Sequence, residues 1–241
     1  MVKVRKWLRT SAAAMAVALA LVACDPVEEG ASGATSVPES SLLGASSSAA
    51  VPGFDPEAEA PAGEAAEVLE TLAVKGRAPK TGYSRDEFGP RWADVDHNGC
   101  DTRNDILDRD LAQVAYQPGT QDCVVVSGVL QDPFTGSEIQ FTRGQDTSSA
   151  VQIDHVVALS DAWQKGAQQL DGETRRLFAN DPLNLLAVEG RSNSQKGDGD
   201  AATWLPANRS FRCDYVSRQI AVKARYGLWV TEAEQDAMQE V

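Results

Sequence analysis

A long stretch near the start of the chain limits what can fold. Residues 24–75 consist mainly of Ala, Gly, Ser, Pro and Glu, with ASGATSVPESSLLGASSSAAVPG at their centre. They hold ten acidic residues against one basic residue, Lys75. Such a segment cannot bury enough apolar surface to offset the conformational entropy lost on folding. We therefore expect a flexible acidic tether, with a short helix near its end, followed by one folded domain at residues 76–241.

The first 23 residues have the features of an export signal. Four basic residues precede a short apolar run, SAAAMAVALALVA, which falls short of the roughly 20 apolar residues of a membrane-spanning helix. The run ends in LVAC, which resembles a bacterial lipobox and predicts that Cys24 becomes a lipid-modified N-terminus. Several acyl chains on Cys24 would anchor the protein to the outer face of the cytoplasmic membrane. The alternative is an ordinary secretory signal that happens to contain a cysteine.

The formal net charge of −13 is distributed unevenly along the chain. Residues 1–24 carry +4, the tether −9 and residues 76–241 −8. Within residues 140–228, 11 basic and 10 acidic residues nearly cancel. The acidity of the whole chain therefore does not describe this region, but it argues against a nucleic-acid binder that depends on bulk positive charge.

Some segments of residues 76–241 have apolar residues at the helical period and others have them at the extended period. Thr231 and Glu234 have the spacing of a helix capping box. Because the strand patterns and the helix patterns are segregated, the sequence predicts an α+β fold rather than a doubly wound sheet. The expected strands are at 123–130, 138–142, 150–160 and 183–188, and the expected helices are at 102–116, 160–170, 172–181, before Pro206, 211–228 and 231–241.

Three cysteines follow the predicted processing site, namely Cys100, Cys123 and Cys213. A disulfide is common in an exported domain of this size. We expect it between Cys100 and Cys123, where it would clamp the loop-rich first half of the domain, although three cysteines allow other pairings. No CxxC motif or Cys/His spacing in the sequence indicates a zinc site.

One ordered set of polar residues in the second half of the domain indicates chemistry. Asp154 and His155 end one expected strand, and Asn184 opens the next. Asn193 and Lys196 follow in NSQK, one helical turn apart, so both project from the same face of a short helix. This strand–strand–helix order brings a carboxylate, an imidazole, two amides and a lysine together.

These residues carry a resemblance to a known family. The segments DHVVAL, NDPLNLLAV and NSQKGDGDAATWLP are similar to the HNH nucleases, whose ββα-metal motif has the same order of Asp-His, Asn and Asn or His. The motif core spans residues 153–204, and the closest likeness is to the exported bacterial branch related to the GmrSD-type C-terminal domain. A looser likeness extends from GYSRDEFGPRW through GCDTRNDIL to YGLWVT. Asn193 stands where many relatives have His, which changes the expected metal more than the expected activity.

The resemblance implies a single HNH nuclease domain at 76–241, with a ββα-metal motif among additional strands and C-terminal helices. It implies a metal-dependent endonuclease that hydrolyses phosphodiester bonds, with DNA favoured over RNA as substrate. It also assigns Asn184 the task of orienting the His155 ring, through its backbone carbonyl across the hairpin. No protein partner is evident from the sequence.

The residue types suit this reaction independently of the family. His155 is the plausible neutral general base, since an unperturbed imidazole has a pKa near 6.5. Asp154 and Asn193 are hard oxygen ligands, which suit one Mg²⁺ or Mn²⁺ ion. Lys196 can either pair with the phosphate or fix the helix. Four arginines are candidate substrate-binding residues: Arg103, Arg175, Arg176 and Arg209.

A second stretch, DVDHNGCDTRND at 94–105, competes for the metal. Its alternating oxygen ligands resemble a calcium loop, and this is the basis of the alternative function, a non-catalytic, calcium-stabilised surface lipoprotein. Asp101 occupies a position that is normally apolar, however, and Asp105 is shorter than the usual Glu. Gly89 and Pro90 stand where an entering helix should run. We therefore expect the stretch to be scaffold.

Overall fold

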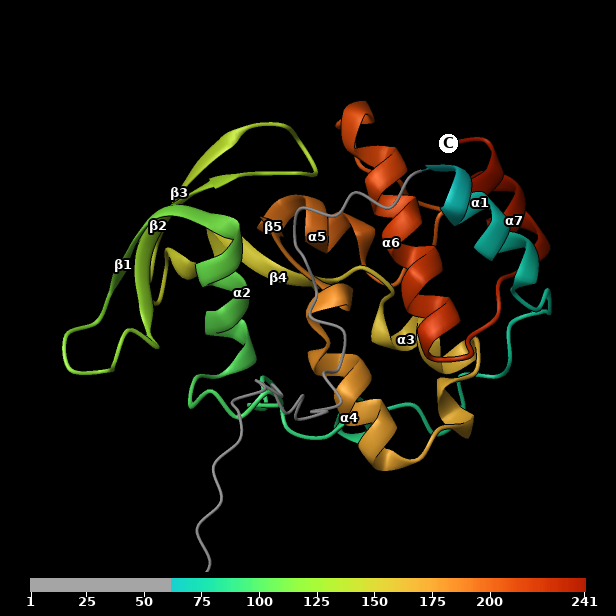
Figure 1. Ribbon diagram of the computed structural model, residues 1–241, viewed down its shortest axis with the longest axis horizontal. Helices are drawn as coiled ribbons and strands as arrows, with labels where there is room; N and C mark the ends of the chain where they lie inside the picture. The colour runs from blue at the N-terminus through green and yellow to red at the C-terminus, as the bar shows by residue number, and fades with distance from the viewer. Residues whose placement is uncertain (1–61) are drawn as a thin grey trace, which may run out of the picture. The chain divides into compact units, whose positions relative to one another are not determined.

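The computed structural model describes residues 62–241 (Figure 1). The expected signal peptide at 1–23, the lipidation site Cys24 and most of the tether lie outside the described residues. Within residues 62–241 the fold is α+β, as predicted, with seven α-helices and two small antiparallel sheets. The helices are α1 (Ala62–Thr71), α2 (Thr102–Asp110), α3 (Leu159–Gln164), α4 (Gly172–Asn180), α5 (Gly190–Lys196), α6 (Arg212–Arg225) and α7 (Glu232–Gln239).

The first sheet has three strands in the order β1 (Leu111–Tyr116), β2 (Val125–Gln131) and β3 (Glu138–Thr142). The predicted pair of strands around the DPFTG turn is confirmed, and Gln131 of β2 pairs with Glu138 of β3. The predicted helix at 102–116 is wrong in its second half, because α2 ends at Asp110 and β1 begins at once. Leu111 turns into the extended region and pairs with Leu130. Pairing with β2 therefore overrides an apolar spacing that also suited a helix.

The second sheet is a ribbon of β4 (Val151–His155) and β5 (Leu185–Glu189), both predicted as strands. One face, including Ile153 and Leu185, packs in a hydrophobic cluster with α2 and the three-stranded sheet. The other face, including Leu186 and Val188, packs in a second cluster with α6. The run LLAV in β5 is continuously apolar because both of its faces are covered.

Helix α5 follows β5 directly and lies against both strands of the ribbon. Its first residue must be glycine, because a Cβ on Gly190 would lie 2.0 Å from the carbonyl oxygen of Ser149. The helix ends at Gly197, which has a φ of 57°. Helix α5 confirms the short helix expected at NSQK. Residues 197–206 contain turns and no helix, so the helix predicted directly before Pro206 is wrong.

Helix α1 belongs to the folded domain rather than to the tether. Leu69 and Leu72 are buried in the cluster that includes Ile220 of α6, and α1 lies alongside α6 (Figure 1). The folded region therefore begins before Gly76, the boundary expected from composition. Helices α6 and α7 are confirmed, and α7 has the predicted capping box of Thr231 and Glu234.

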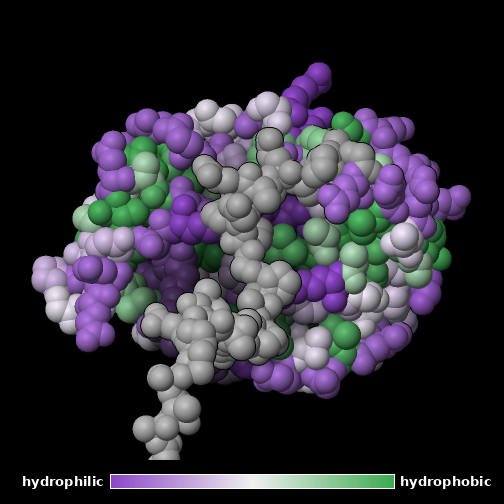
Figure 2. Space-filling model, viewed as in Figure 1, coloured by the Kyte–Doolittle hydropathy of each residue, from purple (hydrophilic) through white to green (hydrophobic). Residues whose placement is uncertain are grey.

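The predicted disulfide between Cys100 and Cys123 is present, and it links the loop before α2 to the loop before β2. Cys213 is free and exposed. On the face seen in Figure 2, hydrophilic side chains predominate and hydrophobic ones show only as small, separate patches. No helix among residues 62–241 has both the length and the apolar character needed to cross a membrane.

Candidate active site

The ββα arrangement predicted from the sequence forms around β4, β5 and α5. Asp154 and His155 are the last two residues of β4, and they pair with Leu186 and Leu185 of β5. Asn184 lies just before β5, and both Asn193 and Lys196 lie on α5.

The ring of His155 is held by a backbone carbonyl. Its Nε2 atom lies 2.9 Å from the carbonyl oxygen of Ala179, at the end of α4. Because a carbonyl can only accept a hydrogen bond, Nε2 carries the proton, and Nδ1 holds a free lone pair when the ring is neutral. The resemblance had assigned the orienting role to the carbonyl of Asn184, and that detail is wrong. The Asn184 carbonyl instead accepts a hydrogen bond from Val156 N, at 2.8 Å.

The environment of His155 favours the neutral ring. Burial lowers the pKa of His155 to about 4, and the positive charges of Arg85 and Lys196 act in the same direction. The hydrogen bond with Ala179 opposes this shift only in part. The imidazole is therefore uncharged at neutral pH and can accept a proton, although it is a weaker base than the free side chain.

Asn184 shapes the chain that follows His155. Its side chain is fully buried, and its Oδ1 atom accepts a hydrogen bond from Val157 N at 2.8 Å. Together with the bond from Val156 N to its carbonyl, this fixes the turn between β4 and α3. Asn184 thus positions His155 through the backbone rather than through a contact with the ring.

Lys196 is a buried partner of Asp154. Its Nζ atom lies 2.8 Å from Asp154 Oδ1 and 2.7 Å from the carbonyl oxygen of His155. Both side chains are at most 4% exposed. Of the two predicted roles for Lys196, the structure therefore gives it the one of fixing α5 to the end of β4.

The second oxygen of Asp154 is available. Its Oδ2 atom is buried and accepts no hydrogen bond from the described residues. Burial raises the pKa of Asp154, and the charge of Lys196 opposes that rise. Asn193, on the same helix, donates from Nδ2 to Gln152 Oε1 at 2.9 Å, which orients its amide toward β4. Asp154 and Asn193 thus offer hard oxygen ligands of the kind that Mg²⁺ and Mn²⁺ prefer.

A hollow opens beside His155. One side of it is the segment from Arg85 to Trp92, and the other includes His155 and Asn180. The rings of Trp92 and His155 lie nearly parallel, at 14°, with their centroids 6.2 Å apart. Asn180 is 1% exposed, and its Oδ1 atom accepts no hydrogen bond from the described residues. Asn180 is the last residue of α4, and no sequence pattern marked it as part of the site.

None of the four predicted substrate-binding arginines lines this hollow. Arg175 donates to the carbonyl of Glu87 and pairs with its carboxylate, and Arg176 pairs with Glu173. Arg103 is partly buried over the ring of Phe141, and Arg209 is exposed in a short 3-10 turn after residue 208. Two arginines of the hollow, Arg85 and Arg91, were missed, and the only signal for them is the looser likeness in GYSRDEFGPRW.

Most carboxylate oxygens of DVDHNGCDTRND accept hydrogen bonds within the loop, but Asp94 Oδ1 is buried and accepts none from the described residues. Asp94 Oδ2 accepts from Gly99 N at 3.0 Å, and Asn98 Nδ2 donates to Asp105 Oδ1 at 3.1 Å. Asp101 caps the start of α2. Among residues 62–241, no group of three or more His, Cys, Asp or Glu side chains is placed to hold a metal ion. That the stretch is scaffold rather than a calcium site stays a prediction.

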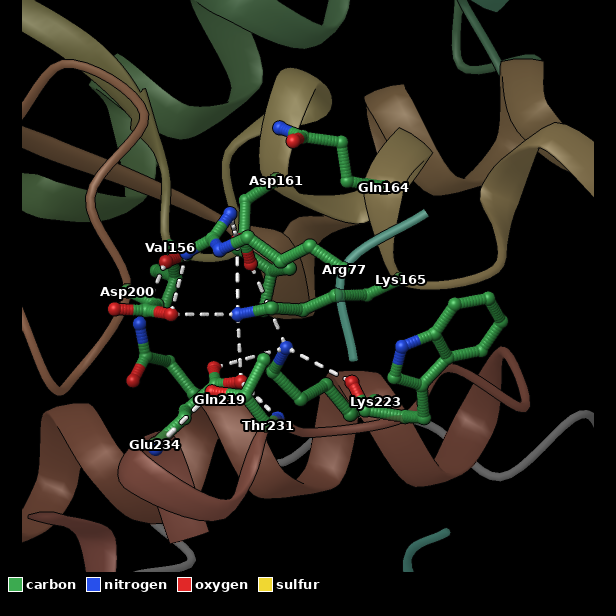
Figure 3. Close-up of polar contacts among 12 residues, drawn as sticks. Arg77, Val156, Asp161, Gln164, Lys165, Asp200, Gln219, Lys223, Thr231 and Glu234 are labelled. Carbon is green, nitrogen blue, oxygen red and sulfur yellow. Dashed lines mark hydrogen bonds and ion pairs between the residues drawn. The ribbon is translucent and has the colours of Figure 1, made fainter. Parts of the chain in front are cut away.

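A cluster of three cations and three carboxylates, all buried except the partly exposed Arg77, joins the elements around the ribbon (Figure 3). Lys165 is at its centre, with Nζ 2.8 Å from Asp200 Oδ2 and 2.6 Å from Glu234 Oε2. The cluster joins α3, α6, α7 and the turn after α5. Its members are Arg77, Asp161, Lys165, Asp200, Lys223 and Glu234.

Comparisons with known proteins identify the family of the chain. A protein described as an uncharacterized secreted protein, from Arthroderma benhamiae, is 38% identical over 179 residues, which cover 73% of this chain and 82% of the relative. No solved structure matches the chain significantly. The family model for the C-terminal domain of GmrSD restriction endonucleases matches residues 101–241, more than half of the chain. The nuclease-like ββα arrangement lies entirely within that match, and the chain belongs to the family of GmrSD-type C-terminal domains.

Proposed function

We propose that the protein is an exported, metal-dependent endonuclease that hydrolyses phosphodiester bonds, with DNA as the favoured substrate. The observation that carries the proposal is the pairing of two groups at the end of β4. His155 has its Nε2 atom fixed by Ala179, which leaves Nδ1 free to accept a proton, and the adjacent Asp154 has a buried oxygen that accepts no hydrogen bond from residues 62–241. Membership of the GmrSD-type family supports a nucleic-acid substrate.

In this proposal each residue has a separate role. His155 Nδ1 takes the proton of the attacking water, and the Ala179 carbonyl keeps the ring in the required tautomer. Asp154 and Asn193 would hold one Mg²⁺ or Mn²⁺ ion, which would polarise the scissile phosphate and stabilise the departing oxygen. Lys196 positions Asp154 through its 2.8 Å contact, and Asn184 positions the turn after His155.

Cleavage of supercoiled plasmid by residues 24–241 tests the activity. We expect nicking with Mg²⁺ or Mn²⁺, inhibition by a chelator, and loss of nicking in His155→Ala with an unchanged circular dichroism spectrum. His97→Asn is the matched control, because His97 is exposed and has a φ of 60°, which Asn tolerates. Equal trace cleavage by the wild type and His155→Ala across several metals would disprove the catalytic role.

The metal is tested without relying on turnover. We expect calorimetry to detect Mn²⁺ binding to the wild type and to lose it in Asp154→Ala. Unchanged Mn²⁺ binding in Asp154→Ala would exclude Asp154 as a ligand. The calcium-stabilised binding module has a weaker basis: Asp94 Oδ1 is also buried and accepts no hydrogen bond from residues 62–241, but its neighbours Asp96 and Asp105 accept hydrogen bonds from Asn98 within the loop.

Export is supported by the predicted signal and by the relative described as secreted. Cys24 lies outside the described residues, so its lipidation stays a prediction. Cys24→Ser should shift the protein from the membrane fraction to the medium, and mass spectrometry should find acyl chains on Cys24 of the wild type. An unmodified Cys24 in the mature protein would favour the ordinary secretory signal.

A further inference from the structure

The segment from Ser84 to Trp92 is built as a fixed wall of the hollow at His155. Phe88 is 1% exposed, and its ring lies 5.9 Å from that of Phe178, between centroids. The side chain of Ser84 caps the short 3-10 turn that begins at Arg85. A segment anchored by a buried ring and a cap keeps its exposed side chains in place.

Two arginines of α4, Arg175 and Arg176, contact the same segment. Arg175 Nε donates to the carbonyl of Glu87 at 2.8 Å. Gly89 has a φ of 75°, and a Cβ there would lie 3.2 Å from Arg176 Cγ, so the chain turns tightly against the Arg176 stem. Arg175 and Arg176, which the sequence indicated as substrate ligands, thus support the segment that carries Arg85 and Arg91.

Arg85 and Arg91 are the cations that this wall presents to solvent, beside the exposed carboxylates of Asp86 and Glu87. Both are exposed, both line the hollow with His155, and neither forms an ion pair with the described residues. Arg175 and Arg176, by contrast, each have a carboxylate partner. Asp86 is the single carboxylate of the hollow, so its positive charge is only partly neutralised. Unpaired guanidinium groups at a fixed position suit the phosphates of a nucleic-acid backbone.

We propose that Arg85 and Arg91 bind the backbone phosphates that flank the one hydrolysed at His155. This inference rests on the proposed function and adds to it the element that holds the substrate. It also fits the nearly neutral charge of residues 140–228, since the phosphate contacts come from a segment outside that region.

Binding of a fluorescent DNA duplex to the inactive His155→Ala protein tests the proposal, with fluorescence anisotropy measured over a series of salt concentrations. Adding Arg85→Ala and Arg91→Ala together should weaken binding. It should also reduce the slope of log K against log salt by about 2, since each phosphate contact contributes about 0.9. Arg85→Lys with Arg91→Lys should restore most of the slope, because the charge is kept. Lys75→Ala is the control, because Lys75 is an exposed cation that does not line the hollow.

The outcomes separate this inference from the proposed function. If the double alanine variant binds with the parent's affinity and salt slope, or if the parent binds no duplex at low salt, the phosphate role is wrong. If the wild type cleaves plasmid while the double variant binds normally, the nuclease function stands and the inference fails. If binding depends on both arginines but the wild type never cleaves, the binding site stands and the catalytic proposal fails.

Discussion

Lys196 Nζ lies 2.8 Å from Asp154 Oδ1, and the two side chains are at most 4% exposed. The pair joins the last turn of α5 to the end of β4, and Lys196 also contacts the carbonyl of His155. A buried carboxylate that loses its cation is strongly destabilising, because neither solvent nor another charge replaces the partner. This contact therefore links the stability of the fold to the geometry of the candidate active site.

Lys196→Met should lower the free energy of unfolding by about 3–5 kcal/mol, measured by urea denaturation, because it leaves Asp154 buried and unpaired. Lys80→Met is the matched control. Lys80 and Asp198 form an ion pair in which both side chains are at least 50% exposed, and its loss should cost less than about 1 kcal/mol. Adding Asp154→Leu to Lys196→Met should recover stability, since both charges are then gone. Equal costs for the two lysine variants would show that the buried pair has no special weight.

The sequence predicted which side chains meet at the site better than it predicted their contacts. Asp154, His155 and Lys196 were predicted as one group, because their strand and helix positions set their directions. The acceptor for the His155 ring is the backbone carbonyl of Ala179. Every residue has a backbone carbonyl, so the residue types alone do not show which one accepts the hydrogen bond. Arg85 lines the hollow although it precedes His155 by 70 positions in the sequence. Tertiary packing brings the two together, and no local sequence pattern predicts it.

Helices and strands were predicted correctly where a segment had one clear hydrophobic period, and incorrectly where the helical and the extended period both fitted the same residues. Helices α4, α6 and α7 were all found, since each has a clear amphipathic pattern or cap. The change from α2 to β1 at Leu111 was missed, because the same apolar residues satisfy a helix until β2 pairs with them. Helix α1 was assigned to the tether because its composition continues that of the tether.

Helix α1 should contribute measurably to stability. Leu69 is 2% exposed in the cluster with α6, so Leu69→Ala should lower the free energy of unfolding by about 2–5 kcal/mol. Glu67→Ala, at an exposed position of the same helix, should change it by less than about 0.5 kcal/mol. Thermal and urea unfolding of both variants, and of a chain that begins at Gly76, provide the measurement. If the chain that begins at Gly76 is as stable as the wild type, α1 is not part of the folded domain.

The disulfide should stabilise the first half of the domain. Cys100 and Cys123 are 23 positions apart, and closing a loop of that size reduces the entropy of the unfolded chain. Replacing both by Ala should lower the free energy of unfolding by about 3 kcal/mol, and a reducing agent should affect only the wild type. Cys213→Ala is the control, because that thiol is free and exposed. A similar loss from Cys213→Ala would point to a different pairing in solution.

The buried ionic cluster should make stability depend on pH through Asp200. Burial alone would raise the pKa of Asp200, but the hydrogen bond and charge of Lys165, with smaller contributions from Thr203 and Arg77, outweigh it and leave the pKa lowered. A carboxyl group whose pKa is lower in the folded state contributes stability above its unfolded pKa, near 3.9. That contribution is lost as the pH falls through the lower, folded value.

Asp200→Asn should therefore be less stable than the wild type by about 1.5–3 kcal/mol near pH 7, because Lys165 loses one charged partner but keeps Asp161 and Glu234. The difference in unfolding free energy between the two proteins should shrink as the pH is lowered below about 4, since the wild type then protonates the same carboxyl. Urea denaturation at a series of pH values measures this difference. Asp198→Asn, two residues away and more than half exposed, should cost less than about 1 kcal/mol throughout. A wild-type advantage that persisted unchanged at low pH would mean that Asp200 acts through packing rather than through its charge.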